Sequence, residues 1–366
     1  MSLTTQWRRK CKLTIDSTKV GATLTNFPVY LVWSGSEATS NLPRGIVDNS
    51  NGSSAKPDGA DIRFSSDEQG INELSFEIVT FAINSVPSTV RAEIHVKLPS
   101  VSNTTNTSFY VWWFNPSATA YATSATYGRN SVWSNSYVSV YHMGESSGSI
   151  IDSVGFVNGS GTGTMPNQTT GKLGNAQNFN GSSYITLSDS SSYDLTTAMS
   201  VSSWVKVTSF STSYQPLVTK GDNTWRVQRN ANLNSLSFDR SLQGGGLVQV
   251  LGAVNVNDGN FHYAVGTFNT TNGTTLYIDG AQDANSPTTT ATQTFTSAVA
   301  IGTNVSHLFR KWNGIIDEVR ISSASRASTW VSTEYNNQNS PNTFISVSNP
   351  VSIGTERIRI IWMPEV

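Results

Sequence analysis

The sequence predicts an all-β protein with two β-sandwich domains, because its length, composition and turn signals agree. The 366 residues suffice for about two domains of ordinary size. Charged residues make up 13% of the chain, too few for coiled coils or helical bundles, and 10% are aromatic. Eight Asn-Gly or Asp-Gly pairs supply the positive φ angles that type I′ hairpin turns require. We therefore expect short strands joined by tight turns.

The expected strands lie where apolar or β-branched residues alternate with polar ones. They cover residues 27–33 and 108–114 in the first half of the chain, and residues 199–207, 261–268 and 275–280 in the second. No segment of the sequence shows a sustained 3.6-residue hydrophobic period, and the best helical candidate is the short segment 325–335. Sheets are therefore expected to form the core.

Two breaks in the strand pattern predict the domain organisation. A stretch rich in Ala, Ser and Thr interrupts the pattern between Asn115 and Ser136, and a second break follows Phe344. The predicted units are a first domain over residues 1–130, a second over residues 131–345 and a C-terminal segment over residues 346–366. That segment contains an apolar strand at residues 357–362, which is expected either to close the second domain at its edge or to dock on a neighbour.

The charge balance and the N-terminus exclude several classes of protein. A net charge of −1 and a pI near 6.4 create no basic field, so nucleic acid is not expected as a partner. Cys11 is the single cysteine, which excludes an intramolecular disulfide and a cysteine metal cluster. Neither an apolar signal-peptide core at the N-terminus nor a run of about eighteen apolar residues occurs, so we expect neither Sec-dependent export nor membrane insertion.

Eight sequence pieces in the second half carry a family resemblance. They are VSVYHMGESSGSIIDSVG, GKLGNAQNFNGSSYITL, MSVSSWVKV, LVTKGD, NFHYAVGTFN, TLYIDG, VAIGTN and NGIIDEVRIS. In this order, over residues 137–344, they resemble the LamG-like family of concanavalin A-type jelly rolls. The resemblance implies that the second domain is a concanavalin A-like jelly roll.

The first half carries a second resemblance. The pieces LTNFPVYL, KPDGADIRFSSDE, EIHVKLPSVS, FYVWWFNP and SVWSNSYVSVYHMGE are similar to a domain of unknown function that often precedes such jelly rolls in bacterial and phage surface proteins. That family brings no established activity. The resemblance implies a β-rich fold, surface display and adhesion to sugars or proteins.

The sequence shows no convincing enzyme signature. Glycoside hydrolysis needs two carboxylates that face each other, and the Glu-x-Asp-x-x-Glu strand used by sugar hydrolases of this fold is absent. Asp317 and Glu318 are adjacent on an expected strand, so alternation should direct them to opposite faces. The GESSG motif at residues 144–148 matches a nucleophile elbow but no helix follows it. The four histidines, His95, His142, His262 and His307, lack metal-ligand spacing. We expect no enzymatic activity.

A structural calcium ion is the cofactor that the sequence suggests. Calcium prefers oxygen ligands from carboxylates and turn carbonyls, and Asp152, Asn158 and Asp317 offer them. The resemblance implies that the first and last strands of the jelly roll are neighbours, which would bring these residues together, and related jelly rolls often bind calcium there. The alternative is that Asp152 caps a turn and that Asp317 forms a buried salt bridge with Arg320 or Lys206.

Glycan binding would depend on aromatic and polar side chains on the loops at one rim of the jelly roll. The candidate ligand-binding residues are Trp225 and the cluster of His307, Phe309, Arg310 and Trp312. The other tryptophans that lie within strand patterns are expected in the core. Sequence alone does not distinguish such a platform from a protein interface.

Three function classes follow from these observations. The first is a non-enzymatic virion surface protein of a bacteriophage, either a head decoration or fibre or a tail receptor-binding element, which displays a glycan-binding jelly roll for host adhesion. The second is a bacterial cell-surface adhesin or carbohydrate-binding module, and the third is a polysaccharide-degrading enzyme. The missing export signal favours the first, because phage proteins assemble in the cytoplasm. The expected partners are other capsid or tail proteins, further copies of the chain and host surface glycans, and the expected location is the virion surface, with the cell surface as the alternative.

Overall fold

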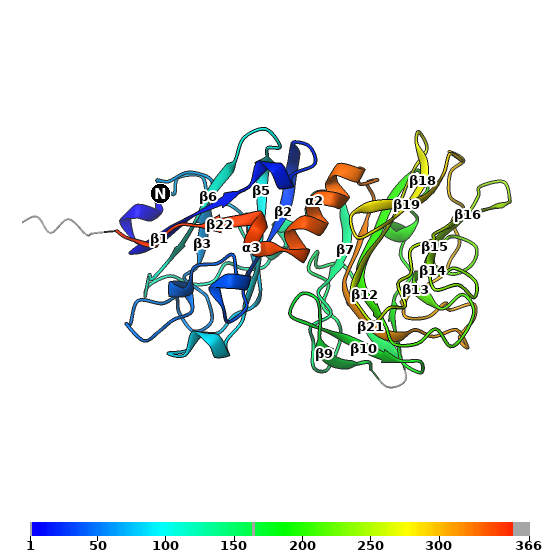
Figure 1. The fold of residues 1–366 in the computed structure, drawn as a ribbon, viewed down its shortest axis with the longest axis horizontal. Helices are drawn as coiled ribbons and strands as arrows, with labels where there is room; N and C mark the ends of the chain where they lie inside the picture. The colour runs from blue at the N-terminus through cyan, green and yellow to red at the C-terminus, as the bar shows by residue number, and fades with distance from the viewer. Residues whose placement is uncertain (1, 163–164, 354–366) are drawn as a thin grey trace, which may run out of the picture.

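Two antiparallel β-sandwiches lie side by side in the computed structural model, which describes residues 2–162 and 165–353 (Figure 1). This architecture confirms the all-β prediction and the two-sandwich organisation. The strand expected at residues 357–362 lies outside the described residues. Within the described ranges, no helix has both the length and the apolar character needed to cross a membrane.

The first sandwich contains eight strands within the described residues. They are β1 (Arg9–Ile15), β2 (Leu24–Trp33), β3 (Arg63–Ser65), β4 (Phe76–Thr80), β5 (Ala92–Val101), β6 (Thr107–Trp113), β22 (Ile345–Val347) and β23 (Val351–Ser352). One sheet has the order β22-β1-β6-β3, with β23 also paired to β1, and the other has the order β2-β5-β4. Along β5, Ile94 and Val96 point into the core between the sheets, whereas Glu93 and His95 point away from it because strand side chains alternate.

The last described strands belong to the first sandwich, although they follow the second one in the sequence. Ile345 of β22 pairs with Ile15 of β1, and Val351 of β23 pairs with Lys10. In Figure 1 the red end of the chain accordingly lies beside the blue β1. The second sandwich is thus inserted between β6 and β22 of the first.

In the part of the chain that the structure describes, the second sandwich contains fifteen strands in two sheets. The sheet nearer the first sandwich contains β7 (Tyr137–Tyr141), β9 (Asn167–Thr170), β10 (Asn175–Asn180), β12 (Ala198–Val207), β17 (His262–Asn269), β18 (Gly273–Ile278), β19 (Ala281–Ser286) and β21 (Asn313–Ser322). The other sheet contains β8 (Ser160–Thr162), β11 (Tyr184–Leu187), β13 (Pro216–Thr219), β14 (Trp225–Arg229), β15 (Leu236–Ser241), β16 (Leu247–Leu251) and β20 (Val299–Ile301).

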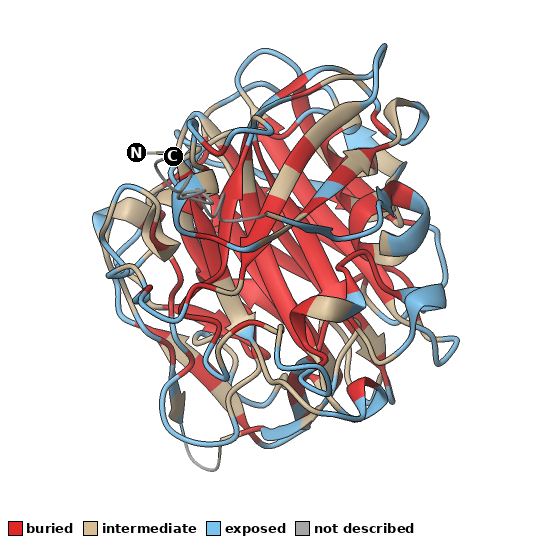
Figure 2. Cartoon of the chain, turned by 90° about the vertical axis from the view of Figure 1, so that its left-hand side faces the viewer, coloured by how far each residue is buried: buried red, intermediate tan, exposed pale blue. Residues whose placement is uncertain are grey.

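Close packing between these two sheets requires a small residue at one position. A Cβ atom at Gly266 of β17 would lie 2.6 Å from the ring of Phe238 on β15, closer than any side chain tolerates. Glycine there lets the Phe238 ring pack directly on the β17 backbone. Figure 2, which views the molecule from the end of the first sandwich, shows buried residues along the strands and exposed residues in the loops around them.

Three helices complete the described chain: α1 (Arg129–Val132), α2 (Ser328–Asn339) and α3 (Pro341–Phe344). The helix expected over residues 325–335 is confirmed as α2, which begins three residues later and ends four residues later.

Helix α2 lies between the sandwiches and contacts both (Figure 1). Trp330 packs in the core of the first sandwich. The Asn337 side chain accepts a hydrogen bond from the backbone N–H of Tyr30 at 2.7 Å and donates one to the Tyr30 carbonyl at 3.1 Å. On its other side, Gln338 accepts a hydrogen bond from the Trp204 indole at 2.6 Å. Because these polar contacts are buried, α2 holds the two sandwiches in one relative position.

The thiol of Cys11 offers a test of how the C-terminal strands are held. Cys11 is fully buried, and its Sγ donates to the carbonyl oxygen of Ser348, 3.0 Å away, just after β22. Burial raises the pKa of the Cys11 thiol to about 11, so the reactive thiolate is scarce at neutral pH. We expect native protein to react slowly with a disulfide reagent such as DTNB and to react with one equivalent after denaturation.

Loosening β22 should expose this thiol. Ile345→Asp places a charge at a buried position of β22, so we expect Cys11 to react at least about tenfold faster, which corresponds to roughly 1.4 kcal/mol less protection. Val347→Asp, at an exposed position of the same strand, is the control and should react like the wild type. Fast reaction of the native wild type would contradict the strand order at this edge.

Candidate functional site

A groove of about 500 Å³ opens at one rim of the second sandwich. Its lining residues come from the loop before β13, from the end of β14 with the turn after it, and from the loop before β21. They are Ser211, Thr212, Ser213, Tyr214, Arg229, Asn232, Phe309 and Arg310. Two of them, Phe309 and Arg310, are predicted ligand-binding residues.

Aromatic rings and a guanidinium group form one wall of this rim groove. The side chain of Phe309 is exposed, with 71% of its surface accessible. The guanidinium carbon of Arg310 lies 5.1 Å from the ring centroid of Tyr214 and 5.4 Å from that of Phe309. These distances allow cation–π attraction, which keeps the two rings and the charge together at the surface.

Arg229 fixes the loops that line the groove. Its guanidinium donates hydrogen bonds of 2.8 Å to the carbonyl oxygens of Leu233 and Thr212 and a third bond to that of Asn232. Burial lowers the pKa of Arg229 from its ordinary value. These hydrogen bonds to backbone carbonyls hold the loops in one conformation. The groove is therefore pre-formed.

His307 lies beside the groove and supports it. Its Nε2 lies 2.6 Å from a carboxylate oxygen of Asp222. Its ring meets the ring of Phe309 edge-on at 5.7 Å between centroids. The structure therefore places His307, Phe309 and Arg310 together, as predicted, but only Phe309 and Arg310 line the groove itself.

A second group of polar side chains is buried between the two sandwiches. Alternation along β4 and β5 turns Glu77, Glu93 and His95 away from the first core. The second sandwich contributes His142, just after β7, and Glu318 on β21. These five residues are among those that line a pocket of about 270 Å³, and we call them the interdomain cluster.

An irregularity in β21 changes where its carboxylates point. The pairing register between β12 and β21 shifts beside Asp317 and Glu318, and Glu318 has a φ of 53°. Ile316 and Val319 both pack in the core of the second sandwich, so both carboxylates between them stay outside it. The expectation that alternation separates Asp317 and Glu318 onto opposite faces is therefore wrong, because a β-bulge interrupts the alternation.

Charges in the interdomain cluster set one another's protonation. Burial opposes a charge on His142, but the carboxylates of Glu318 and Glu77 outweigh it and hold the pKa of His142 well above its ordinary value. Burial alone would raise the pKa of Glu318, but the charges of His142 and Arg320 outweigh it and hold that pKa well below its ordinary range. Burial lowers the pKa of His95 well below its ordinary value. A charged His142 thus lies beside a neutral His95 at neutral pH.

Comparison with known families identifies part of the second sandwich. Residues 179–332 match the model of the concanavalin A-like lectin/glucanases superfamily. This stretch runs from β10 to α2 and includes Phe309, Arg310 and Glu318. We refer to the second sandwich below as the concanavalin A-like domain. No curated protein matches the sequence.

Solved structures that resemble part of the chain include binding domains of bacterial toxins and one domain of an arabinanase. The binding domain of Paraclostridial mosquitocidal protein 1 has 14% identity and a TM-score of 0.47, over 55% of this chain and 52% of that one. A second similar structure is Domain 4 of AbnA, a GH43 extracellular arabinanase from Geobacillus stearothermophilus, in complex with arabinotriose. It has 21% identity and a TM-score of 0.44, and the match covers 54% of this chain and 97% of that one. The binding domain of botulinum neurotoxin DC in complex with SialylT has 13% sequence identity and a TM-score of 0.42, and the match covers 56% of this chain and 52% of that one. The chain therefore spans about half the length of the two toxin domains.

Two predicted glycan-binding residues lie elsewhere in the concanavalin A-like domain. Trp225 and Trp312 are both buried in its hydrophobic core, so their assignment to the rim is wrong. Trp225 begins β14 on the side that faces the core, and its indole N–H donates to the carbonyl oxygen of Tyr193. Trp312 packs edge-on against Phe210 with 5.8 Å between ring centroids. Both residues stabilise the domain on which the groove is built.

The predicted calcium ligands have other partners in the structure. Both oxygens of Asp152 accept backbone hydrogen bonds, from the N–H groups of residues 140, 154, 156 and 157. The Asn158 side chain accepts a bond from the Asp152 N–H, and Asp317 accepts one from Leu173. Asp152 thus organises the turn before Asn158, as the alternative interpretation held. Calcium at Asp152, Asn158 and Asp317 stays a prediction, and it would have to displace backbone donors from Asp152.

The interdomain cluster was missed at the sequence level. Its members lie far apart in the chain: 176 residues separate His142 from Glu318, and 65 separate Glu77 from His142. Alternation in the segment EIHVK could have shown that His95 lies off the core face of β5. It could not have shown which strand of the other domain faces it.

Truncation of the aromatic residues should separate core from rim. Trp312→Ala removes a fully buried ring and should lower the free energy of unfolding by about 3–5 kcal/mol, and Trp225→Ala should behave alike. Phe309→Ala removes an exposed ring and should change stability by no more than about 0.5 kcal/mol. Urea unfolding followed by circular dichroism measures all three variants. A Trp312→Ala protein as stable as the wild type would contradict the core assignment.

Proposed function

We propose that the chain is a non-enzymatic adhesion protein whose concanavalin A-like domain binds glycans in the rim groove. The observation that carries this proposal is the pre-formed wall of Tyr214, Phe309 and Arg310. Aromatic rings stack on the apolar faces of sugar rings, and guanidinium and amide groups bind sugar hydroxyls and carboxylates.

Polar groups of the groove support this interpretation. The hydroxyl of Thr212 is shielded from solvent and finds no hydrogen-bond partner in the described part of the chain. Ser211 is exposed at the groove and offers a further hydroxyl. A polyhydroxylated ligand would satisfy such groups, whereas a purely apolar ligand would leave them unpaired.

The groove is better suited to binding than to hydrolysis. Glycoside hydrolysis requires a pair of carboxyl groups flanking the scissile bond. The described residues that line the rim groove include no aspartate or glutamate. A ligand held there contacts aromatic rings, amides, hydroxyls and guanidinium groups but no side-chain carboxyl group among the described residues.

Display on a particle would complete this function. A shallow groove buries little of a sugar, so single-site affinity should be low, and many copies on one particle would supply avidity. We place the protein on the surface of a bacteriophage virion, as a head decoration, fibre or tail receptor-binding element. In this arrangement the first sandwich attaches to capsid or tail proteins and the concanavalin A-like domain faces the host.

Mass spectrometry of purified particles tests the location. The protein should be present in many copies per virion and should remain after washing in high salt. Recovery only from a bacterial envelope would instead assign it to a cell-surface adhesin. Recovery only as a free monomer would contradict display altogether.

Glycan binding is tested by screening the full chain on an array of bacterial surface polysaccharides. Phe309→Ala and Arg310→Ala should each weaken the best hit at least about tenfold, or roughly 1.4 kcal/mol, because they remove the exposed wall of the groove. Phe295→Ala is the matched control, since it removes an exposed ring outside the groove and should bind normally. Release of reducing or unsaturated sugar ends would contradict the non-enzymatic assignment.

A further inference from the structure

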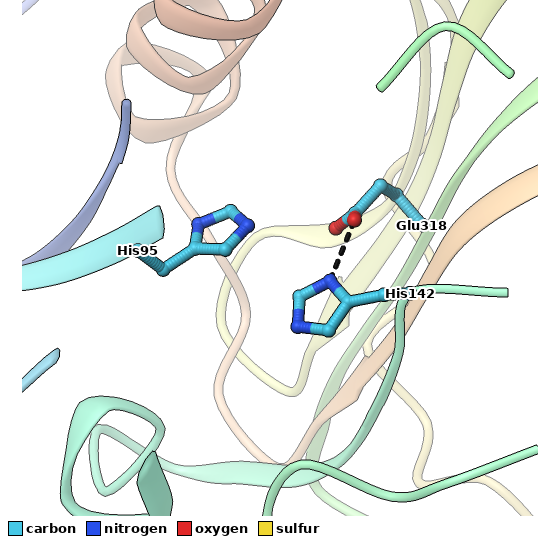
Figure 3. A group of neighbouring side chains, drawn as sticks. All are labelled: His95, His142 and Glu318. Carbon is cyan, nitrogen blue, oxygen red and sulfur yellow. Dashed lines mark hydrogen bonds and ion pairs between the residues drawn. The ribbon is translucent and has the colours of Figure 1, made fainter. Parts of the chain in front are cut away.

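We infer that the interdomain cluster binds a divalent transition-metal ion of the zinc type through His95, His142 and Glu318. The ligand atoms of these three residues all lie within 4.8 Å of one another, and all three side chains are buried. His95 comes from β5 of the first sandwich, and the other two come from the concanavalin A-like domain. Figure 3 shows the three side chains converging from these separate strands.

His95 is the observation that points to a ligand. Only 1% of its surface is exposed, yet neither ring nitrogen has a hydrogen-bond partner among the described residues. A buried imidazole left in this state loses its hydration without compensation. In Figure 3 its ring extends towards His142 and Glu318, and the His95 and His142 rings lie 5.0 Å apart between centroids. A metal ion would satisfy one of the two nitrogens.

His142 and Glu318 already contact each other and have the outer partners that metal ligands usually have. The Nδ1 of His142 lies 2.6 Å from Oε1 of Glu318, while its Nε2 lies 3.1 Å from Glu77. The second oxygen of Glu318 accepts a 2.6 Å bond from Arg320. Ligating histidines typically donate their other N–H to a carboxylate, as His142 can to Glu77. A metal ion would replace the proton between Nδ1 and Oε1, and these two atoms would move apart to hold it at zinc–ligand distances of about 2.0–2.2 Å.

Hydrogen bonds also fix the position of Glu77, the outer partner of His142. It accepts hydrogen bonds of 2.6 Å from the Trp133 indole and from the Ser153 hydroxyl. Its position is therefore set by residues from the segment that joins the domains and from the concanavalin A-like domain. Such fixed outer partners preserve the ring orientation of the ligand that they contact.

The charge balance around the pocket favours a cation. Glu77 and Glu93 approach from the first sandwich, Glu318 from β21, and Glu334 from α2. Two guanidinium groups, those of Arg91 and Arg320, contact three of these four carboxylates. The fourth carboxylate, Glu77, contacts His142, so with His142 charged one negative charge is left in excess among these buried groups, where uncompensated charge is costly. A divalent ion that takes the place of the His142 proton would balance that charge.

The ligand types select among metals. Calcium and magnesium prefer oxygen ligands alone, whereas imidazole nitrogens suit zinc and its first-row neighbours. Two histidines and one glutamate match a zinc site that keeps a further position for water. The pocket of about 270 Å³ beside the three residues has room for that water.

The experiment uses the full chain after treatment with a chelator. Zinc ions should bind with one ion per chain in isothermal titration calorimetry, and cobalt(II) ions should give the visible absorption of a low-coordinate site. His95→Gln should weaken zinc binding by about a hundredfold or more while the protein stays folded, because His95 makes no hydrogen bond in the described chain. Glu77→Gln should weaken it by about 10–100-fold, as outer partners of metal ligands typically do.

His262→Gln is the matched control. His262 also lies between two carboxylates, those of Asp258 and Asp279, but outside the cluster, so this variant should bind zinc like the wild type. Absence of zinc and cobalt binding to the folded wild type would overturn the inference. So would a His95→Gln protein that binds zinc with unchanged affinity. Glycan binding in the rim groove should be the same in all these variants. Loss of zinc binding therefore tests the metal site without testing the glycan site.

Discussion

The relative position of the two sandwiches depends on one buried guanidinium, that of Arg320. It donates to Glu318 on its own strand and to Glu334 on α2, and Glu334 in turn accepts a 2.7 Å bond from Tyr263. Each of these groups has lost its hydration, so removing one partner leaves the others buried and unpaired, at a cost of about 3–5 kcal/mol. The contacts of His142 with Glu77 extend the same network into the first sandwich. This network adds to the contacts of Asn337 and Gln338 by which helix α2 holds the two domains together.

The β-bulge at Glu318 makes the network geometrically feasible. A regular strand would send every second side chain into the hydrophobic core, and one of two adjacent carboxylates would be buried among apolar groups. The positive φ of Glu318 and the register shift keep both Asp317 and Glu318 on the side of the first sandwich, near Leu173. Non-glycine residues seldom adopt this conformation, and its energetic cost is offset by the ionic contacts that it permits.

Local patterns predicted much of the fold, and non-local contacts account for what they missed. Alternation predicted five of the strands, because that signal lies within a few residues, and the short segment 325–335 was the best helical candidate. The two sandwiches were predicted from alternation and Asn-Gly turns together with the family resemblance. Trp312 and Phe309 are three residues apart in one loop, yet one is buried and the other exposed, and composition does not separate them. Phe309 and Arg310 were identified as surface candidates, but their partners Tyr214 and Arg229 were not. The cluster of His95, His142 and Glu318 depends on how two domains pack, which no local pattern encodes.

The insertion of one domain into the other has a consequence for synthesis on the ribosome. Strand β1 emerges before the inserted domain, whereas its partners β22 and β23 emerge after it. Until then, that edge of β1 presents unpaired N–H and C=O groups beside an incomplete core, which favours pairing with other chains. The pairing of β1 with β22 forms only after the inserted domain has been made. Folding of that domain brings its two ends together and so shortens the loop that must close between β6 and β22. Slow translation through the inserted domain would therefore favour correct completion of the first sandwich.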